Sequence, residues 1–207
     1  MNTVTEKGKI RLFIALDLPL VNDQNEPIQF VNSQLLIIQA VADFRPVKNF
    51  HVTLVFIGSV NESLVPAIKI AIERAVAQFS NEQKQGLING IGQLMLKPGA
   101  AIMGKNAVAL SLIDNYLIES LIATLLTVFQ QYQIPHAERH EGLNLHVTIG
   151  RVPIDVKKQI DTKRFLDLLP APIGGRAQLN ETFTASTITL YESHPNSEYT
   201  PLATFKI

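Results

Sequence analysis

One short pattern of residues occurs twice in this 207-residue chain. A histidine is followed two positions later by a threonine at His51 and Thr53, and again at His146 and Thr148. In a β-strand, side chains two positions apart point to the same face of the sheet. If both segments are strands, each one presents an imidazole beside a hydroxyl, with the residue between them pointing into a core.

This combination of side chains suits chemistry at a phosphodiester. The ordinary pKa of imidazole is about 6.5, so near neutral pH one histidine can be neutral while the other is protonated. The neutral ring can take a proton from an attacking water or hydroxyl, and the protonated ring can give one to the leaving oxygen. Threonine hydroxyls can donate hydrogen bonds to the phosphate oxygens, where negative charge gathers. The residues alone therefore predict phosphoryl transfer at a paired His/Thr site.

With these motifs, the chain resembles the two-histidine (2H) phosphoesterase superfamily. Within it, the resemblance is to the LigT-like branch, the RNA 2',3'-cyclic phosphodiesterases once called 2'-5' RNA ligases. The resemblance covers most of the chain. Its segments are RLFIALDLP (11–19), HVTLVFIGSV (51–60), HVTIGRV (146–152), ITLYES (188–193) and YTPLATF (199–205).

The resemblance implies a fold and an activity. The expected fold is a single α+β domain over residues 1–207, with two intimate lobes. Two mixed or antiparallel sheets, related by a pseudo-twofold around a central cleft, carry helices on the outside. The implied activity is metal-independent hydrolysis of RNA or oligonucleotide 2',3'-cyclic phosphate ends to a 2'-phosphate, accompanied by weak, reversible 2'-5' RNA ligation. The implied partners are RNA ends or small nucleotides that carry a cyclic phosphate.

Four residues carry the implied catalysis. By the resemblance, His51 is the acid that protonates the leaving 3'-oxygen, and His146 is the base that activates water. A symmetric site also permits the reverse assignment, so the direction stays open. Thr53 and Thr148 are expected to hold the phosphate.

Two further residues are implied to bind substrate. Arg151 comes after the second motif and is expected to contact phosphate, and Phe56 comes after the first and is expected to stack on a base. Strict alternation along a strand, however, turns both side chains away from the face of the histidines. A β-bulge at Gly150 would bring Arg151 back to that face. The role of Lys105 is left open.

Other functions remain in competition. The chain could be a nucleotide-binding module without catalysis, or a 2H phosphoesterase for another substrate, such as ADP-ribose cyclic phosphate or a 2'-5' oligonucleotide. The segment HAERH (136–140) has the wrong spacing for the known zinc-binding helix signatures. We expect no metal and no cofactor.

The elements that must position these residues can be predicted from hydrophobic patterning. Apolar runs predict strands over residues 10–18, 52–57, 86–96, 108–113, 145–152, 178–191 and 202–207. Three- and four-residue spacing predicts helices over 28–41, from an Asn61 cap through Phe79, and from an Asp114 cap through Phe129. Pro98-Gly99 predicts a turn, and residues 165–169 a helical turn.

Composition excludes several classes of protein. Lys+Arg and Asp+Glu are both 18, so the zero net charge argues against a protein that coats long nucleic acids. The absence of cysteine excludes disulfides and thiolate nucleophiles. No apolar run is long enough to span a membrane, and the N-terminal segment lacks the apolar region of a secretory signal. We expect a cytoplasmic monomer.

Overall fold

A computed structural model describes residues 8–18, 45–47, 50–85, 94–103, 107–113, 116–137, 145–151, 183–195 and 198–207. The helix predicted over 28–41, the cap at Asp114 and the turn over 165–169 lie outside these residues.

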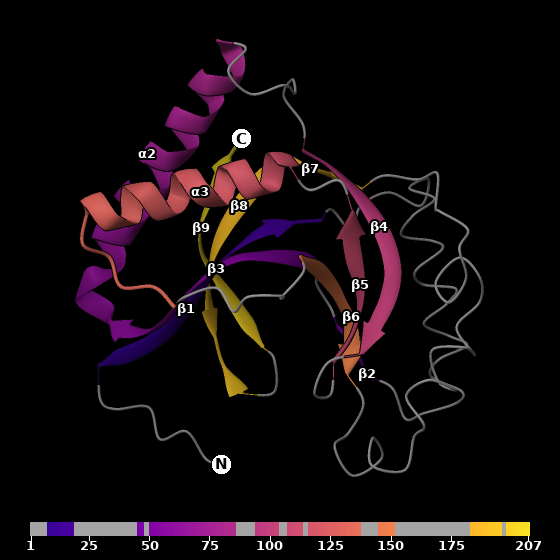
Figure 1. Cartoon of the computed structure of the whole chain (residues 1–207). Coiled ribbons are helices and arrows are strands. Elements are labelled where there is room, and N and C mark those ends of the chain that lie inside the picture. Colours follow the sequence, from indigo (N-terminus) through magenta and orange to yellow (C-terminus); the bar gives the residue numbers. More distant parts are fainter. Residues whose placement is uncertain are drawn as a thin grey trace.

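The fold is built on an antiparallel sheet (Figure 1). Its strands are β1 (Lys9–Asp17), β2 (Arg45–Pro46), β3 (His51–Asn61), β4 (Leu94–Met103), β5 (Ala107–Ile113), β6 (His146–Arg151), β7 (Phe183–Ala185), β8 (Thr187–Ser193) and β9 (Tyr199–Lys206). Hydrogen-bonded neighbours have the order β7-β4-β5-β6-β3-β1-β8-β9, with β2 paired to β6. The expected α+β class with antiparallel strands is confirmed.

The sheet consists of two matching halves. One half is β7-β4-β5-β6, and the other is β9-β8-β1-β3. They meet where β3 pairs with β6, at the single residue pair Val52 and Val147. Because β3 and β6 carry the two His-Thr motifs, this pseudo-twofold arrangement brings the two motifs together.

Among the described residues, two helices cover one face of the sheet. After a 3-10 turn, η1 (Glu62–Leu64), the chain forms α2 (Val65–Lys84), and later α3 (Tyr116–Gln131). Both helices lie over the half that contains β3, β1, β8 and β9 (Figure 1). The apolar stripes predicted from the sequence are the buried ones, with Ile68, Ile72 and Phe79 on α2 and Leu121 and Phe129 on α3.

Alternate residues of β1 separate two hydrophobic clusters. Leu12, Ile14 and Leu16 belong to the main core, together with the buried residues of both helices. Phe13 and Ala15 face the other way and pack with Tyr191 in a small second cluster. Within the apolar run predicted over 10–18, residues 12–16 are therefore buried on both faces, as expected of a strand inside a sheet.

Three local predictions are wrong. Pro98-Gly99 does not end a strand but lies within β4, at an irregularity in its pairing with β5. β7 pairs only with Leu94–Leu96. Pro98 lies beyond this pairing, so its lack of a backbone N–H removes no hydrogen bond between β4 and β7. Asn61 makes no side-chain cap and precedes η1, whereas the cap residue of α2 is Leu64. Of the strand predicted over 178–191, residues 178–182 lie outside the described residues, and the rest belongs to two strands, β7 and β8, interrupted at Ser186.

Candidate active site

The two His-Thr motifs begin the two strands that join the halves of the sheet. His51 is the first residue of β3, and His146 is the first residue of β6. Between each histidine and its threonine lies a valine that is 0% exposed at Val52 and 2% exposed at Val147. Because the valines are paired with each other and buried in the core, the histidines and threonines share the opposite face of the sheet.

Antiparallel register determines which of these side chains are neighbours. Continuing the Val52–Val147 pairing by one residue in each direction sets His51 opposite Thr148 and Thr53 opposite His146. Facing residues in such a ladder have Cβ atoms about 4.5–5.5 Å apart, and diagonal neighbours about 7–8 Å apart. All four side chains are partly exposed. The register therefore brings two imidazoles and two hydroxyls to neighbouring positions on one face of the sheet.

The outer neighbours of the two strands have the same pattern. The carbonyl of Phe50, just before the first motif, accepts a hydrogen bond of 3.1 Å from the amide of Leu18 at the end of β1. The carbonyl of Leu145, just before the second motif, accepts one of 2.8 Å from the amide of Leu112 in β5. β1 therefore stands beside β3 as β5 stands beside β6.

A bulge lies just after the first motif. Along β3 and β1 the pairing passes from Thr53–Ala15 to Val55–Ile14, which leaves one residue of β3 without a partner residue in β1. The extra residue reverses the alternation of faces, so Phe56 returns to the face of the histidine. The inference from strict alternation is therefore wrong for Phe56, whose side chain is 47% exposed.

A bulge also lies just after the second motif. Along β6 and β5 the pairing passes from Thr148–Ala109 to Gly150–Val108, and again one residue is left over. The bulge considered at Gly150 is thus present, with Ile149 before it as the extra residue, and the register turns Arg151 towards the face of the histidine. Phe56 and Arg151 occupy equivalent positions in their strands, three residues after the threonine.

His51 lies among aromatic rings that the sequence pattern did not assign to the site. Its ring centroid is 5.5 Å from that of Phe13, 6.1 Å from that of Tyr191 and 5.3 Å from that of Tyr199. The Phe13 ring also lies 6.1 Å from the Phe56 ring. This aromatic cluster supports one side of the imidazole and forms an apolar rim next to it.

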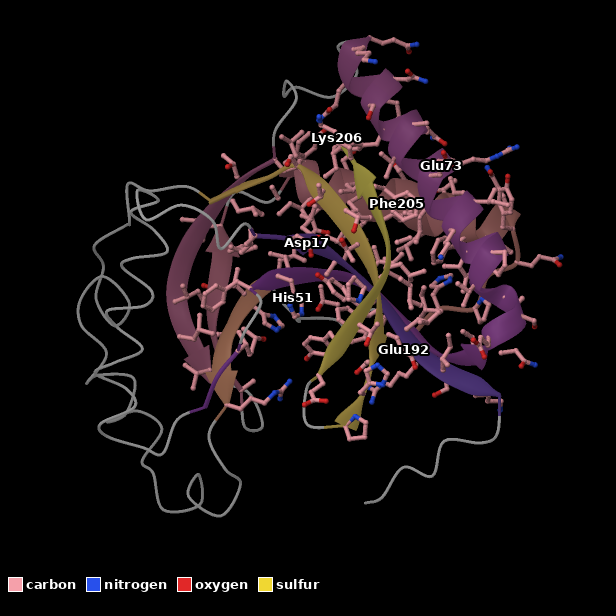
Figure 2. All side chains as sticks on the ribbon, turned by 180° about the vertical axis from the view of Figure 1, so that it is seen from behind. Asp17, His51, Glu73, Glu192, Phe205 and Lys206 are labelled. Carbon is pink, nitrogen blue, oxygen red and sulfur yellow. The ribbon has the colours of Figure 1, made fainter. Side chains whose placement is uncertain are left out.

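Asp17 is the second feature that the sequence pattern did not assign. It is paired with His51 across β1 and β3, and Figure 2 shows the two residues close together. Its carboxylate accepts a hydrogen bond of 2.6 Å from the Tyr191 hydroxyl and another from the hydroxyl of Thr189. Burial, with the hydrogen bond to Asp17 and its negative charge, raises the pKa of Tyr191, so this phenol remains a donor.

The remaining candidates lie elsewhere. Lys105 and His140 fall outside the described residues. His136 comes after α3, and its Nδ1 lies 3.2 Å from the carbonyl oxygen of Ile134. Within the described residues, no three His, Asp or Glu side chains are grouped to bind a metal ion. No helix in this part of the chain is long and apolar enough to cross a membrane.

Comparison of sequences finds no match, because no family model and no curated protein corresponds to this chain. Comparison of structures finds many. E. coli LigT complexed with 3'-AMP has a TM-score of 0.60 at 21% identity, over 96% of this chain and 98% of LigT. TT0787 of Thermus thermophilus has a TM-score of 0.55 at 17% identity, over 95% of this chain and 97% of its own. The MHV ns2 PDE domain has a TM-score of 0.52 at 11% identity, over 71% of this chain and 86% of the domain. The chain therefore has the fold of the LigT-like 2H phosphoesterases.

Proposed function

We propose that this protein is a phosphodiesterase that opens 2',3'-cyclic phosphates at the ends of RNA or oligonucleotides and leaves a 2'-phosphate. The observation that carries the proposal is the pairing of Val52 with Val147. This pair brings two imidazole–hydroxyl couples from distant parts of the chain to one face of the sheet.

The arrangement supports a single concerted reaction. His146, as a neutral base, takes a proton from water while the water oxygen attacks phosphorus. The bond between phosphorus and the 3'-oxygen breaks, and His51, as an acid, gives its proton to that oxygen. Thr53 and Thr148 donate hydrogen bonds to the non-bridging oxygens, where charge increases in the transition state. Exchange with solvent restores both protonation states, and no other group has to enter the balance.

The two ends of the site suit the two parts of a nucleotide. Arg151 on β6 offers a guanidinium to phosphate oxygens, and Phe56 on β3 offers an exposed ring to a base. LigT has been crystallised with 3'-AMP, phosphate, NADP+ and ATP, which supports a nucleotide as the ligand of this fold. Weak 2'-5' ligation would be the same step with a ribose 5'-hydroxyl in place of water: the bond from its oxygen to phosphorus forms while the bond from phosphorus to the 3'-oxygen breaks. The reverse of that step, attack by the 3'-hydroxyl, would release the 5'-hydroxyl again.

The test is hydrolysis of an oligonucleotide that ends in a 2',3'-cyclic phosphate, in buffer with EDTA. We expect turnover to a 2'-phosphate end by the natural chain. His51→Ala and His146→Ala should each lower kcat by about 10²- to 10⁴-fold. His194→Ala is the matched control, since this histidine lies in the β8–β9 connection, where it bonds to Thr200. Equal rates for the natural chain and the His51/His146 double variant would overturn the proposal.

A panel of substrates separates the finer alternatives. ADP-ribose cyclic phosphate and 2'-5' oligonucleotides share the chemistry at phosphorus and differ in what surrounds it. The highest kcat/KM in the panel identifies the substrate class. Calorimetric binding of 3'-AMP without turnover of any member would favour a nucleotide-binding module instead.

A further inference from the structure

The two histidines have different neighbours at equivalent positions of the sheet. Across β1 and β3, His51 is paired with Asp17. Across β5 and β6, His146 is paired with Ser111. The residues next to Asp17 and Ser111, Leu18 and Leu112, make matching amide hydrogen bonds to the residues that precede the histidines, so the two positions correspond. One imidazole thus has a carboxylate beside it where the other has a hydroxyl.

The Asp17 carboxylate accepts hydrogen bonds from buried hydroxyl groups on the neighbouring strand β8. Thr189, which is 1% exposed, donates a hydrogen bond from its hydroxyl to one carboxylate oxygen. Tyr191, which is 8% exposed, donates one to the other oxygen. Thr189 has one proton to give, so its contact of 3.0 Å with the hydroxyl of Thr204 has Thr204 as the donor. This chain of donors across β8 and β9 fixes the carboxylate of the residue that is paired with His51.

Asp17 is the carboxylate on this side of the site among the described residues. The titratable or charged side chains of these strands that face the same way come from four strands. They are Lys9, Arg11 and Asp17 from β1, Tyr191 from β8, Tyr199 and Lys206 from β9, and His146 and Arg151 from β6. Glu192 pairs with Leu12, a core residue, so it belongs to the other face of the sheet. The negative charge next to His51 therefore comes from Asp17.

We propose that Asp17 is a positioning residue for His51, whose anchored carboxylate orients the imidazole and stabilises its protonated form. Residues paired in an antiparallel ladder have Cβ atoms about 4.5–5.5 Å apart, and a carboxylate at about this distance favours the charged form of a base by roughly 10-fold or more. The proposal rests on the proposed phosphodiesterase for its consequence, which is that His51 is the acid. Ser111 offers His146 a neutral hydroxyl at the corresponding ladder position, which suits this ring to act as the base. Asp17 itself does not touch the reacting atoms.

The test compares Asp17→Asn with the natural chain. The variant keeps the size of the side chain and removes its charge. We expect the midpoint of the His51 titration, measured by the NMR signals of its ring, to move to lower pH. We also expect the alkaline limb of the pH–rate profile to move the same way, with kcat at the alkaline end lowered about 10-fold. Glu82→Gln, the same change at an exposed site on α2, is the control and should alter neither. An unchanged His51 titration in a folded Asp17→Asn variant would overturn the proposal.

A second variant tests the proposal without changing Asp17 or its hydrogen bonds. Ser111→Asp adds a carboxylate at the equivalent position beside His146, and we expect the His146 titration to move to higher pH. An unmoved titration would contradict the role that we assign to this ladder position. The NMR readouts need no turnover. A natural chain without hydrolysis whose His51 responds to Asp17→Asn would overturn the proposed function and leave the Asp17 inference standing.

Discussion

His51 and His146 begin their strands with the same local sequence, but their surroundings differ. Aromatic rings from β1, β8 and β9 pack around His51, and Asp17 is its neighbour in the ladder. The corresponding neighbour of His146 is Ser111. The reaction needs one histidine as proton donor and the other as proton acceptor. Different surroundings favour this division, because identical surroundings would give both rings the same affinity for protons.

The threonines make a prediction at the same scale. Thr53→Ala and Thr148→Ala should each lower kcat by at most about 10²- to 10³-fold, the effect of losing one donor to a developing oxyanion. Serine at either position should restore most of the rate because it retains the hydroxyl. Thr127→Ala on α3, where the hydroxyl bonds to a carbonyl of its own helix, is the control. If serine and alanine variants were equally impaired, the hydroxyls would not be the groups that act.

At the scale of the strand, the sequence predicts each motif better than the backbone just beyond it. The period of two places each histidine beside its threonine, because the two are close in sequence and no irregularity intervenes. Gly150 indicates the bulge in β6. Of the two register shifts between β3 and β1, however, the one that follows the motif falls among branched apolar residues, between Thr53 and Val55. A bulge there is set by pairing with β1, which local sequence does not reveal.

The bulge in β3 makes Phe56 testable as a contact with substrate. Phe56→Ala should raise KM about 5-fold or more and change kcat little, because stacking on a base is worth at least about 1 kcal/mol. Ile70→Ala is a matched control, since this apolar side chain is 49% exposed on α2, a helix that packs on the core face of the sheet and not on the face of the histidines. An equal effect of both substitutions on KM would exclude a direct contact between Phe56 and the base.

Gly58 provides a prediction about stability. It has a φ of 85° within β3, and a Cβ added there would meet no atom within 4 Å. Gly58→Ala should therefore lower the free energy of unfolding by about 1–2 kcal/mol through backbone strain alone. Ser59→Ala at the next, exposed position should change it by less than about 0.5 kcal/mol. Urea denaturation measures both, and an unaltered stability of the glycine variant would contradict the strain.

At the scale of the whole molecule, the sequence predicts the class of fold and the four catalytic candidates, but not the order of the strands. The meeting of β3 with β6 joins residues about half a chain apart, and the resemblance to a known family, rather than periodicity, implied it. Asp17 was missed for the same reason. It reads as the polar end of an apolar strand, and only the pairing of β1 with β3 and β8 shows its neighbours.

The central claim is that one protonated and one neutral histidine act on the same phosphate. The pH dependence of kcat/KM for a cyclic-phosphate oligonucleotide tests it most directly. The account predicts a bell-shaped profile between about pH 5 and 9 for the natural chain. In the His51→Ala and His146→Ala variants, the profile of the residual activity should each time lack one of the two limbs. A profile with a single ionisation in this range would contradict the account.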